Sequence, residues 1–164
     1  MKLIRHSIFE TNSSSTHSLT MCMKDTYDKW VNGELFYSME DNKFYNDEEH
    51  MIMVKKAVID SQIEYSGKRL EDEEGNFIGY DSKYTYKGIT TSKKEDHYTQ
   101  ENLDEITDYM IQQAYEDNYI SSYDVPMSYE EYENYISDYE SYYEAFETPD
   151  NEIVVGFGYY GQDY

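Results

Sequence analysis

Acidic side chains recur along residues 128–147 at a spacing that suggests recognition of a cationic partner. Ser128 and Glu131 form an S-x-x-E capping box, which predicts a helix that reaches Glu147 and ends before Pro149. One side of this predicted helix carries Glu130, Glu133, Glu140, Glu144 and Glu147, with Glu131 and Asp138 beside them. Carboxylates at helical intervals can imitate the row of phosphates along a nucleic-acid strand. The sequence therefore predicts a surface that binds lysine and arginine side chains.

Aromatic residues fill the rest of this stretch. Tyr135 and Tyr142, one heptad apart, are expected to lie near the acidic side and to stack on guanidinium groups of the partner. The other aromatic and apolar positions form a seam with spacings of three and four residues: Tyr129, Tyr132, Ile136, Tyr139, Tyr143 and Phe146. Such a seam is typical of a packed helix face, either within one chain or across a homodimer.

A second acidic helix is predicted just before the first. Thr99 is a suitable N-cap, and the helix is expected to run to about Tyr119. Its apolar positions recur every three or four residues, at Leu103, Ile106, Met110 and Ala114. Its exposed acids are expected to be Asp104, Asp108, Glu116 and Asp117. Two acidic helices of this kind could present two charged ridges to one partner.

Charge is strongly segregated along the 164 residues. The chain contains 13 Lys and Arg against 35 Asp and Glu, a formal net charge of −22. Residues 1–94 hold all 13 basic and 16 acidic residues, whereas residues 95–164 hold 19 acidic residues, no basic residue and 14 of the 21 tyrosines. This charge argues against a basic nucleic-acid-binding surface, and direct binding to nucleic acid is not expected. The aromatic content argues against disorder in spite of the charge.

The remaining elements favour an α+β fold in a single domain of residues 1–164, with a near-neutral half and a strongly acidic half. We expect a small, mostly antiparallel sheet with two or three helices, including the two acidic ones. Strands are expected at residues 3–9, 34–38 and 153–157, with a polar loop at residues 11–18 and a hairpin formed by residues 76–80 and 84–90. A further helix is expected to begin at residue 47 and to end near residue 67.

Several patterns that resemble chemical motifs fail on closer reading. Residues 156–161 match G-x-G-x-x-G, but we expect no following helix to hold a pyrophosphate and therefore no dinucleotide site. Residues 71–75 lack a ligand at the first position of a calcium loop, so a solvated turn is expected there. His6, His17, Cys22 and His50 lack the spacing of a zinc site, and we expect no metal or cofactor.

The sequence also bears on cellular location. Cys22 is the only cysteine, so a disulfide within the chain is impossible and a reducing compartment fits. No signal peptide and no transmembrane span is expected, and we predict a cytoplasmic protein that does not interact with membranes.

The opening segment, Ile4-Arg5-His6-Ser7-Ile8-Phe9-Glu10-Thr11-Asn12-Ser13-Ser14-Ser15-Thr16-His17-Ser18, resembles the N-terminal segment of uncharacterised proteins encoded by phages of Gram-positive bacteria. This resemblance implies a viral setting and no particular mechanism. The acidic half is similar, in charge and aromatic content, to phage-encoded DNA-mimic inhibitors of restriction enzymes and CRISPR nucleases.

Three functions follow as hypotheses. The first is a non-enzymatic phage inhibitor that occludes the basic nucleic-acid-binding channel of a host defence nuclease. The second is a phage enzyme that modifies a host factor, in which the run Ser13, Ser14, Ser15 and His17 supplies nucleophile and base, with Arg5 or Glu10 nearby. The third is a protein-binding module whose exposed tyrosines contact a surface without a nucleic-acid role.

Overall fold

The computed structural model describes residues 15–121 and 123–162, which form two compact units. Of the described residues, the first unit comprises 15–47 and 126–162, and the second comprises 48–121 and 123–125. Neither boundary coincides with the change of charge after Lys94. Within the described residues the fold is α+β, as expected, but it has five α-helices rather than two or three and eight strands in three small antiparallel sheets.

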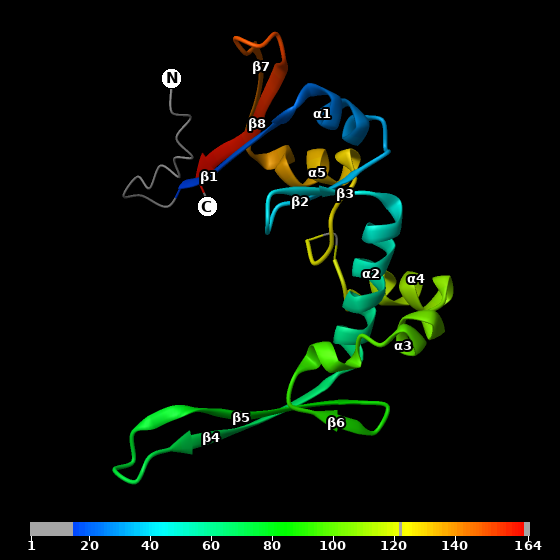
Figure 1. Ribbon diagram of the computed structural model, residues 1–164, viewed down its shortest axis with the longest axis vertical. Helices are drawn as coiled ribbons and strands as arrows, with labels where there is room; N and C mark the ends of the chain where they lie inside the picture. Colours follow the sequence, from blue (N-terminus) through cyan, green and yellow to red (C-terminus); the bar gives the residue numbers. More distant parts are fainter. Residues whose placement is uncertain (1–14, 122, 163–164) are drawn as a thin grey trace. The chain divides into compact units, whose positions relative to one another are not determined.

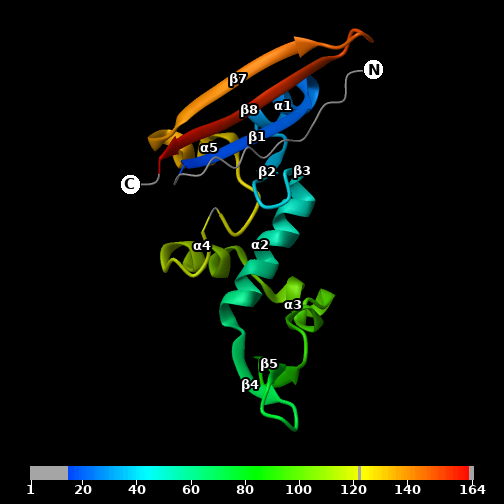
Figure 2. The same ribbon diagram turned by 90° about the vertical axis from the view of Figure 1, so that its left-hand side faces the viewer.

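The first unit is built on a three-stranded antiparallel sheet (Figure 1). Its strands, in spatial order, are β1 (Ser15–Met23), β8 (Ile153–Gln162) and β7 (Glu140–Glu147). In this register Phe157 of the central strand lies opposite Thr20 on one side and Tyr143 on the other. Helices α1 (Lys24–Val31) and α5 (Tyr129–Tyr135) lie against one face of the sheet (Figure 2). The 3-10 helix η2 (Ile136–Asp138) joins α5 to the turn into β7.

The core of this unit is an aromatic cluster around Trp30. Trp30 is fully buried, and its indole N–H donates a hydrogen bond to the carbonyl oxygen of Met127 at 3.2 Å. Six aromatic rings lie 5.0–5.9 Å from the Trp30 ring, centroid to centroid. They belong to Tyr27, Tyr37, Phe44, Tyr129, Tyr132 and Phe157. Tyr37 and Phe44 belong to a two-stranded ribbon formed by β2 (Phe36–Ser38) and β3 (Lys43–Tyr45). The cluster therefore packs this ribbon against α1, α5 and β8.

The second unit packs short helices on one long helix, α2 (Asp47–Gln62). Its partners are the 3-10 helix η1 (Lys94–His97), α3 (Gln100–Glu105) and α4 (Asp108–Glu116). The core contains Val54, Val58 and Ile59 of α2 with Leu103, Ile106 and Ala114. Three of the four apolar positions predicted at residues 103–114 are therefore buried, and the fourth, Met110, is half-buried and packs against them.

A three-stranded antiparallel sheet extends the second unit. It consists of β4 (Glu64–Glu71), β5 (Phe77–Tyr86) and β6 (Ile89–Thr91), with β5 in the centre. The expected hairpin of residues 76–80 and 84–90 is wrong, because β5 continues through Asp81 and Ser82, where a turn was predicted. The turn lies instead at Asp72, whose carboxylate accepts hydrogen bonds from the backbone N–H groups of Glu74 and Asn76.

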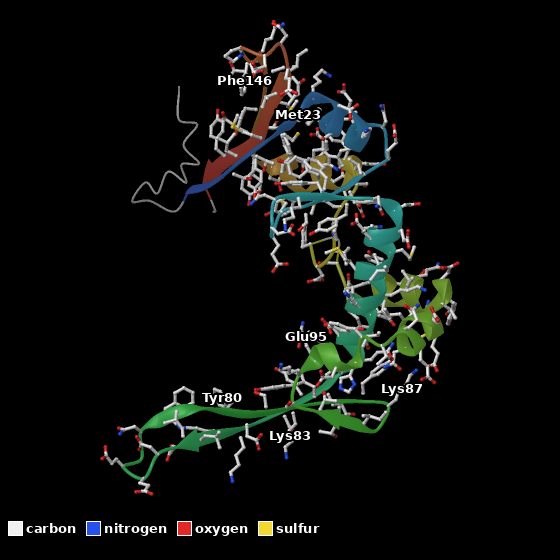
Figure 3. The ribbon with its side chains drawn as sticks, in the orientation of Figure 1. Met23, Tyr80, Lys83, Lys87, Glu95 and Phe146 are labelled. Carbon is white, nitrogen blue, oxygen red and sulfur yellow. The ribbon has the colours of Figure 1, made fainter. Side chains whose placement is uncertain are left out.

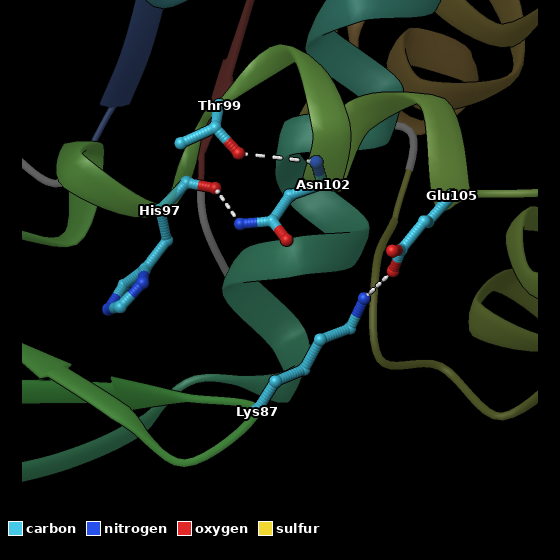
Figure 4. A network of polar contacts seen from close by, with 5 residues as sticks. All are labelled: Lys87, His97, Thr99, Asn102 and Glu105. Atoms are coloured by element: carbon cyan, nitrogen blue, oxygen red, sulfur yellow. Dashed lines mark hydrogen bonds and ion pairs between the residues drawn. The ribbon is translucent and has the colours of Figure 1, made fainter.

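Polar contacts join the base of this sheet to η1 and α3 (Figure 4). The His97 ring is buried, and its Nε2 lies 3.0 Å from the carbonyl oxygen of Tyr84. Asn102 donates from Nδ2 to the carbonyl oxygen of His97 at 2.8 Å, and Lys87 forms an ion pair with Glu105. The expected N-cap is confirmed, because the Thr99 hydroxyl accepts from the backbone N–H of Asn102.

Both predicted acidic helices are shorter than the sequence suggests. The capping box of Ser128 and Glu131 is confirmed, yet the helix ends at Tyr135 and residues 140–147 form β7 instead. Tyrosine and phenylalanine suit strands, and unpaired like charges three or four residues apart disfavour a helix, so pairing with β8 prevails. The helix expected over residues 99–119 is broken at Thr107, which caps α4 with its hydroxyl.

The predictions at the ends of the chain have mixed outcomes. The helix beginning at residue 47 is confirmed but ends at Gln62, five residues before Gly67. The closing strand is confirmed and is longer than expected, so the glycines of residues 156–161 lie inside β8. The strand expected at residues 3–9 lies outside the described residues, and the loop expected at 11–18 is wrong at residues 15–18, which belong to β1.

Replacing Trp30 tests the role of the aromatic cluster. We expect Trp30→Ala to lower the free energy of unfolding of the first unit by about 3–5 kcal/mol, because it removes a fully buried ring and leaves a cavity. Urea denaturation followed by tyrosine circular dichroism measures the change. Val31→Ala, on the adjacent and exposed position of α1, serves as the control and should cost far less. Equal losses in the two variants would contradict a central role for Trp30.

Two glycines of β8 offer a matched test of sheet packing. A Cβ at Gly158 would overlap the carbonyl oxygen of Ser18 and lie 3.1 Å from the Tyr142 ring, whereas a Cβ at Gly156 would meet only Leu19 Cδ1 at 3.8 Å. We expect Gly158→Ala to destabilise the protein by about 1–3 kcal/mol, as overpacking commonly does. Gly156→Ala should be nearly neutral in the same urea titration. The reverse order would show that the strands can separate locally at little cost.

Candidate functional site

The carboxylates of α5, η2 and β7 form the main candidate site, which we call the acidic segment (residues 130–147). Its seven predicted site acids are all exposed. They are Glu130, Glu131 and Glu133 on α5, Asp138 on η2, and Glu140, Glu144 and Glu147 on β7. The sequence supplies no Lys or Arg between residues 95 and 164.

These carboxylates are not neutralised by ion pairs among the described residues. The ion pairs there join lysines and Arg69 to acids of other segments, at Asp25, Asp28, Asp41, Asp60, Glu71 and Glu105. On α1, for example, both lysines have a carboxylate partner one helical turn away. The acidic segment therefore keeps its full negative charge for an external partner or for solvent.

The expected single row of carboxylates is wrong, because the segment is half helix and half strand. Glu130 and Glu133 lie three residues apart on α5 and share a side of that helix. On β7 the side chains alternate, so Glu140 and Glu144 lie on one face of the strand and Glu147 on the other. The charges are thus spread over a short helix and two faces of a strand.

Two of the acids also have structural roles. The Glu131 carboxylate accepts hydrogen bonds from the backbone N–H of Ser128 at 2.7 Å and from its hydroxyl at 2.8 Å. Glu140 accepts a hydrogen bond from the Tyr160 hydroxyl, which raises the pKa of Tyr160 above its ordinary value. In addition, β7 pairs only with β8 among the described strands, and charged side chains on such an edge discourage pairing with other chains.

The two tyrosines expected beside these acids lie close to the core. Tyr135 is half-buried, and its ring centroid lies 5.7 Å from that of Tyr159. Tyr142 is also half-buried and lies against Gly158. Of the predicted seam, Tyr132 and Ile136 are buried, whereas Tyr143 and Phe146, which follow the end of α5, are 50% and 37% exposed.

The second predicted set of acids lies in the other unit. Asp104, Asp108, Glu116 and Asp117 are all exposed. Asp104 accepts a hydrogen bond from Gln100 on α3, and Glu116 accepts from Gln112 and Gln113 on α4. Asp108 and Asp117 lie at the start and at the C-cap of α4. These acids therefore belong to the second unit, where glutamine side chains donate hydrogen bonds to Asp104 and Glu116.

Sequence reasoning missed a pocket of about 330 Å³ in the first unit. We call it the tyrosine pocket. Six aromatic residues line it: Tyr27, Tyr129, Tyr132, Tyr142, Tyr143 and Phe157. Glu133 of the acidic segment lies in its wall. These residues come from α1, α5, β7 and β8, so no local pattern in the sequence could have revealed the pocket.

A second feature that the sequence did not reveal is an aromatic face on the sheet of the second unit. Tyr65 and Tyr84 lie opposite each other on β4 and β5, with ring centroids 5.3 Å apart. Farther along the same ribbon, the Arg69 guanidinium lies 5.1 Å from the centre of the Phe77 ring. Tyr80 and Lys83 point to opposite sides of β5, as Figure 3 shows. One face is therefore aromatic and the other polar.

The structure does not test the enzyme hypothesis. The side chains of the Ser/His run up to His17 lie outside the described residues, so this hypothesis stays a prediction. Within residues 18–121 and 123–161, no three His, Cys, Asp or Glu side chains converge to hold a metal ion. Among the described residues, no helix has the length and apolar character needed to cross a membrane.

Comparison with protein-family models, curated proteins and solved structures finds no match to this chain.

The half-buried thiol of Cys22 gives a test that depends on pH. Burial raises the pKa of Cys22 to about 11, so the reactive thiolate is scarce near neutral pH. At pH 8 we expect iodoacetamide to modify the folded protein roughly a hundredfold more slowly than a thiol of ordinary pKa. Mass spectrometry against the urea-unfolded chain measures this ratio. The folded rate should increase steadily from pH 8 to pH 10, and a rate equal to that of the unfolded chain would contradict the assignment.

Proposed function

We propose that this protein is a phage-encoded, non-enzymatic inhibitor of a bacterial defence nuclease of the CRISPR or restriction type. It acts in the host cytoplasm by mimicking the charge of nucleic acid and occluding the basic channel of the nuclease. The observation that supports this proposal is the acidic segment, whose seven carboxylates are exposed and lack ion pairs among the described residues.

The physical argument concerns the cost of such a surface. Like charges that are not interspersed with cations repel one another and destabilise the folded state. A lysine- and arginine-rich channel relieves this repulsion on binding and gains attraction, which also accelerates association. A channel evolved for nucleic acid has this charge. The inhibitor needs no reactive group for such an effect, so it acts stoichiometrically.

Reversing acids that have no structural role tests the proposal. We choose the triple variant Glu130→Lys, Glu144→Lys and Glu147→Lys, which leaves the capping Glu131 and the hydrogen-bonded Glu140 in place. Reversal turns attractive pairs, each worth about 0.2–1 kcal/mol when exposed, into repulsive ones. We expect binding to the partner to weaken more than about tenfold. The full chain serves as bait in a lysate of a Gram-positive bacterium, with washes at low and high salt and with competing DNA.

The matched control reverses three exposed acids of the second unit, Glu64, Glu73 and Glu95, and so changes the net charge equally. The proposal requires that the bait captures a nucleic-acid-binding protein in stoichiometric amount and that high salt or competing DNA releases it. The control variant should still capture this partner, and the acidic-segment variant should not. Retention by both variants, or resistance to salt and DNA, would contradict charge mimicry by this segment. Inhibition of the captured nuclease in vitro then measures function directly.

The aromatic face of β4 and β5 favours a second candidate, a protein-binding module without a nucleic-acid role. Tyr65, Phe77 and Tyr80 are each more than half exposed on this ribbon. Exposed aromatic side chains are enriched at protein interfaces. A partner held by this face resists both salt and competing DNA and is lost on Tyr80→Ser, which distinguishes it from a partner of the acidic segment.

A further inference from the structure

The tyrosine pocket combines aromatic walls with a single carboxylate. The ring of Tyr27, in the lining, lies 5.1 Å from the ring of Tyr143, 6.2 Å from that of Tyr129 and 5.4 Å from that of Phe157. These rings are tilted or perpendicular to one another, so both faces and edges of aromatic groups line the space. Tyr143, on β7, also lines the pocket and is half exposed.

The charge of the pocket resides on Glu133. The ring centroids of Tyr27 and Tyr129 lie 6.2 Å apart, and Glu133 is the one charged residue of the pocket lining. Burial raises the pKa of both phenols above the ordinary value, so they stay neutral. Lys24 lies near Tyr143, but its ammonium group is already held by Asp28 at 2.5 Å. The pocket therefore carries one negative charge without a matching cation.

The wall also contains a hydroxyl that lacks a partner. The Tyr142 hydroxyl is buried and makes no hydrogen bond to any described residue. A buried polar atom in this state is unusual, because nearly all such atoms are hydrogen-bonded. This oxygen has no accessible surface, so it adds no acceptor to the pocket.

We propose that the tyrosine pocket binds the guanidinium group of an arginine side chain from a protein partner. A guanidinium is planar and weakly hydrated, so it stacks on aromatic rings, and its N–H groups can donate to a carboxylate and to a phenol oxygen at once. A lysine ammonium is more strongly hydrated and lacks the flat face. The pocket would thus recognise one arginine among the many cations that the acidic segment attracts.

This inference rests on the proposed function only in assuming a basic protein partner, and it can be tested without one. The probes are three blocked tripeptides, Gly-Arg-Gly, Gly-Lys-Gly and Gly-citrulline-Gly, titrated into the full chain labelled with ¹³C on its tyrosine rings. Citrulline keeps the shape of arginine and removes its charge. We expect the arginine peptide to shift the ring signals of Tyr27, Tyr129 and Tyr143, the lysine peptide to bind more weakly and the citrulline peptide to leave the signals unchanged.

Two glutamates of α5 provide matched variants. Glu133→Gln removes the carboxylate in the pocket, and Glu130→Gln makes the same change three residues earlier, outside the pocket lining. We expect the affinity for the arginine peptide to fall about tenfold in Glu133→Gln and to stay within about twofold in Glu130→Gln. Tyr143→Leu, which removes one aromatic ring of the lining and keeps the carboxylate, should weaken binding as well.

Several results would overturn the inference. The first is that the arginine and citrulline peptides bind with equal affinity, and the second is that the arginine and lysine peptides do. The third is that Glu133→Gln and Glu130→Gln lose equal affinity for the arginine peptide. Each leaves the acidic-segment proposal standing, because that proposal depends on capture by Glu130, Glu144 and Glu147, two of which lie on β7. Conversely, specific arginine binding with no loss of capture in the charge-reversal variant would support the pocket and refute charge mimicry.

Discussion

The packing of aromatic rings around Trp30 is the interaction on which the first unit depends. It joins helix α1 and the β2–β3 ribbon, from early in the chain, to α5 and β8 from its end. Aromatic pairs at such distances contribute about 0.5–1.5 kcal/mol each beyond the burial of their area. The segment from residue 126 onward has no Lys or Arg, so attraction between opposite charges within it cannot offset the repulsion among its carboxylates. The rings supply the cohesion instead.

Tyrosine suits this arrangement because it serves the core without adding charge. Its ring packs like phenylalanine while its hydroxyl can remain near the surface. Burial raises the pKa of Tyr27, Tyr132 and Tyr159 well above the ordinary value, and neighbouring phenols or Glu133 raise it further. The phenols therefore stay neutral beside a dense set of carboxylates. The same property makes the walls of the tyrosine pocket neutral, so that its charge comes from one glutamate.

The sequence was a good guide where local chemistry decides the structure. The capping box at Ser128, the N-cap at Thr99 and the start of α2 are confirmed, because each depends on residues within one helical turn. It was a poor guide for residues 140–147, where the aromatic spacing fits both a helix and a strand and pairing with β8 determines the outcome. The tyrosine pocket had no local signal, since Tyr27 and Phe157 are 130 residues apart.

The strand conformation of β7 also limits the kind of mimicry that is possible. Residues on one face of a strand advance by about 6.6 Å every second position, so Glu140 and Glu144 lie about 13 Å apart along it. Phosphates along one DNA strand advance by only about 3.4 Å per nucleotide. The carboxylates of β7 are therefore too sparse to replace phosphates one by one, and the acidic segment can reproduce only the overall negative potential of nucleic acid. A potential of this kind attracts any basic channel, so selectivity requires a contact of defined shape, and the arginine site that we propose in the tyrosine pocket would supply such a contact within the same unit.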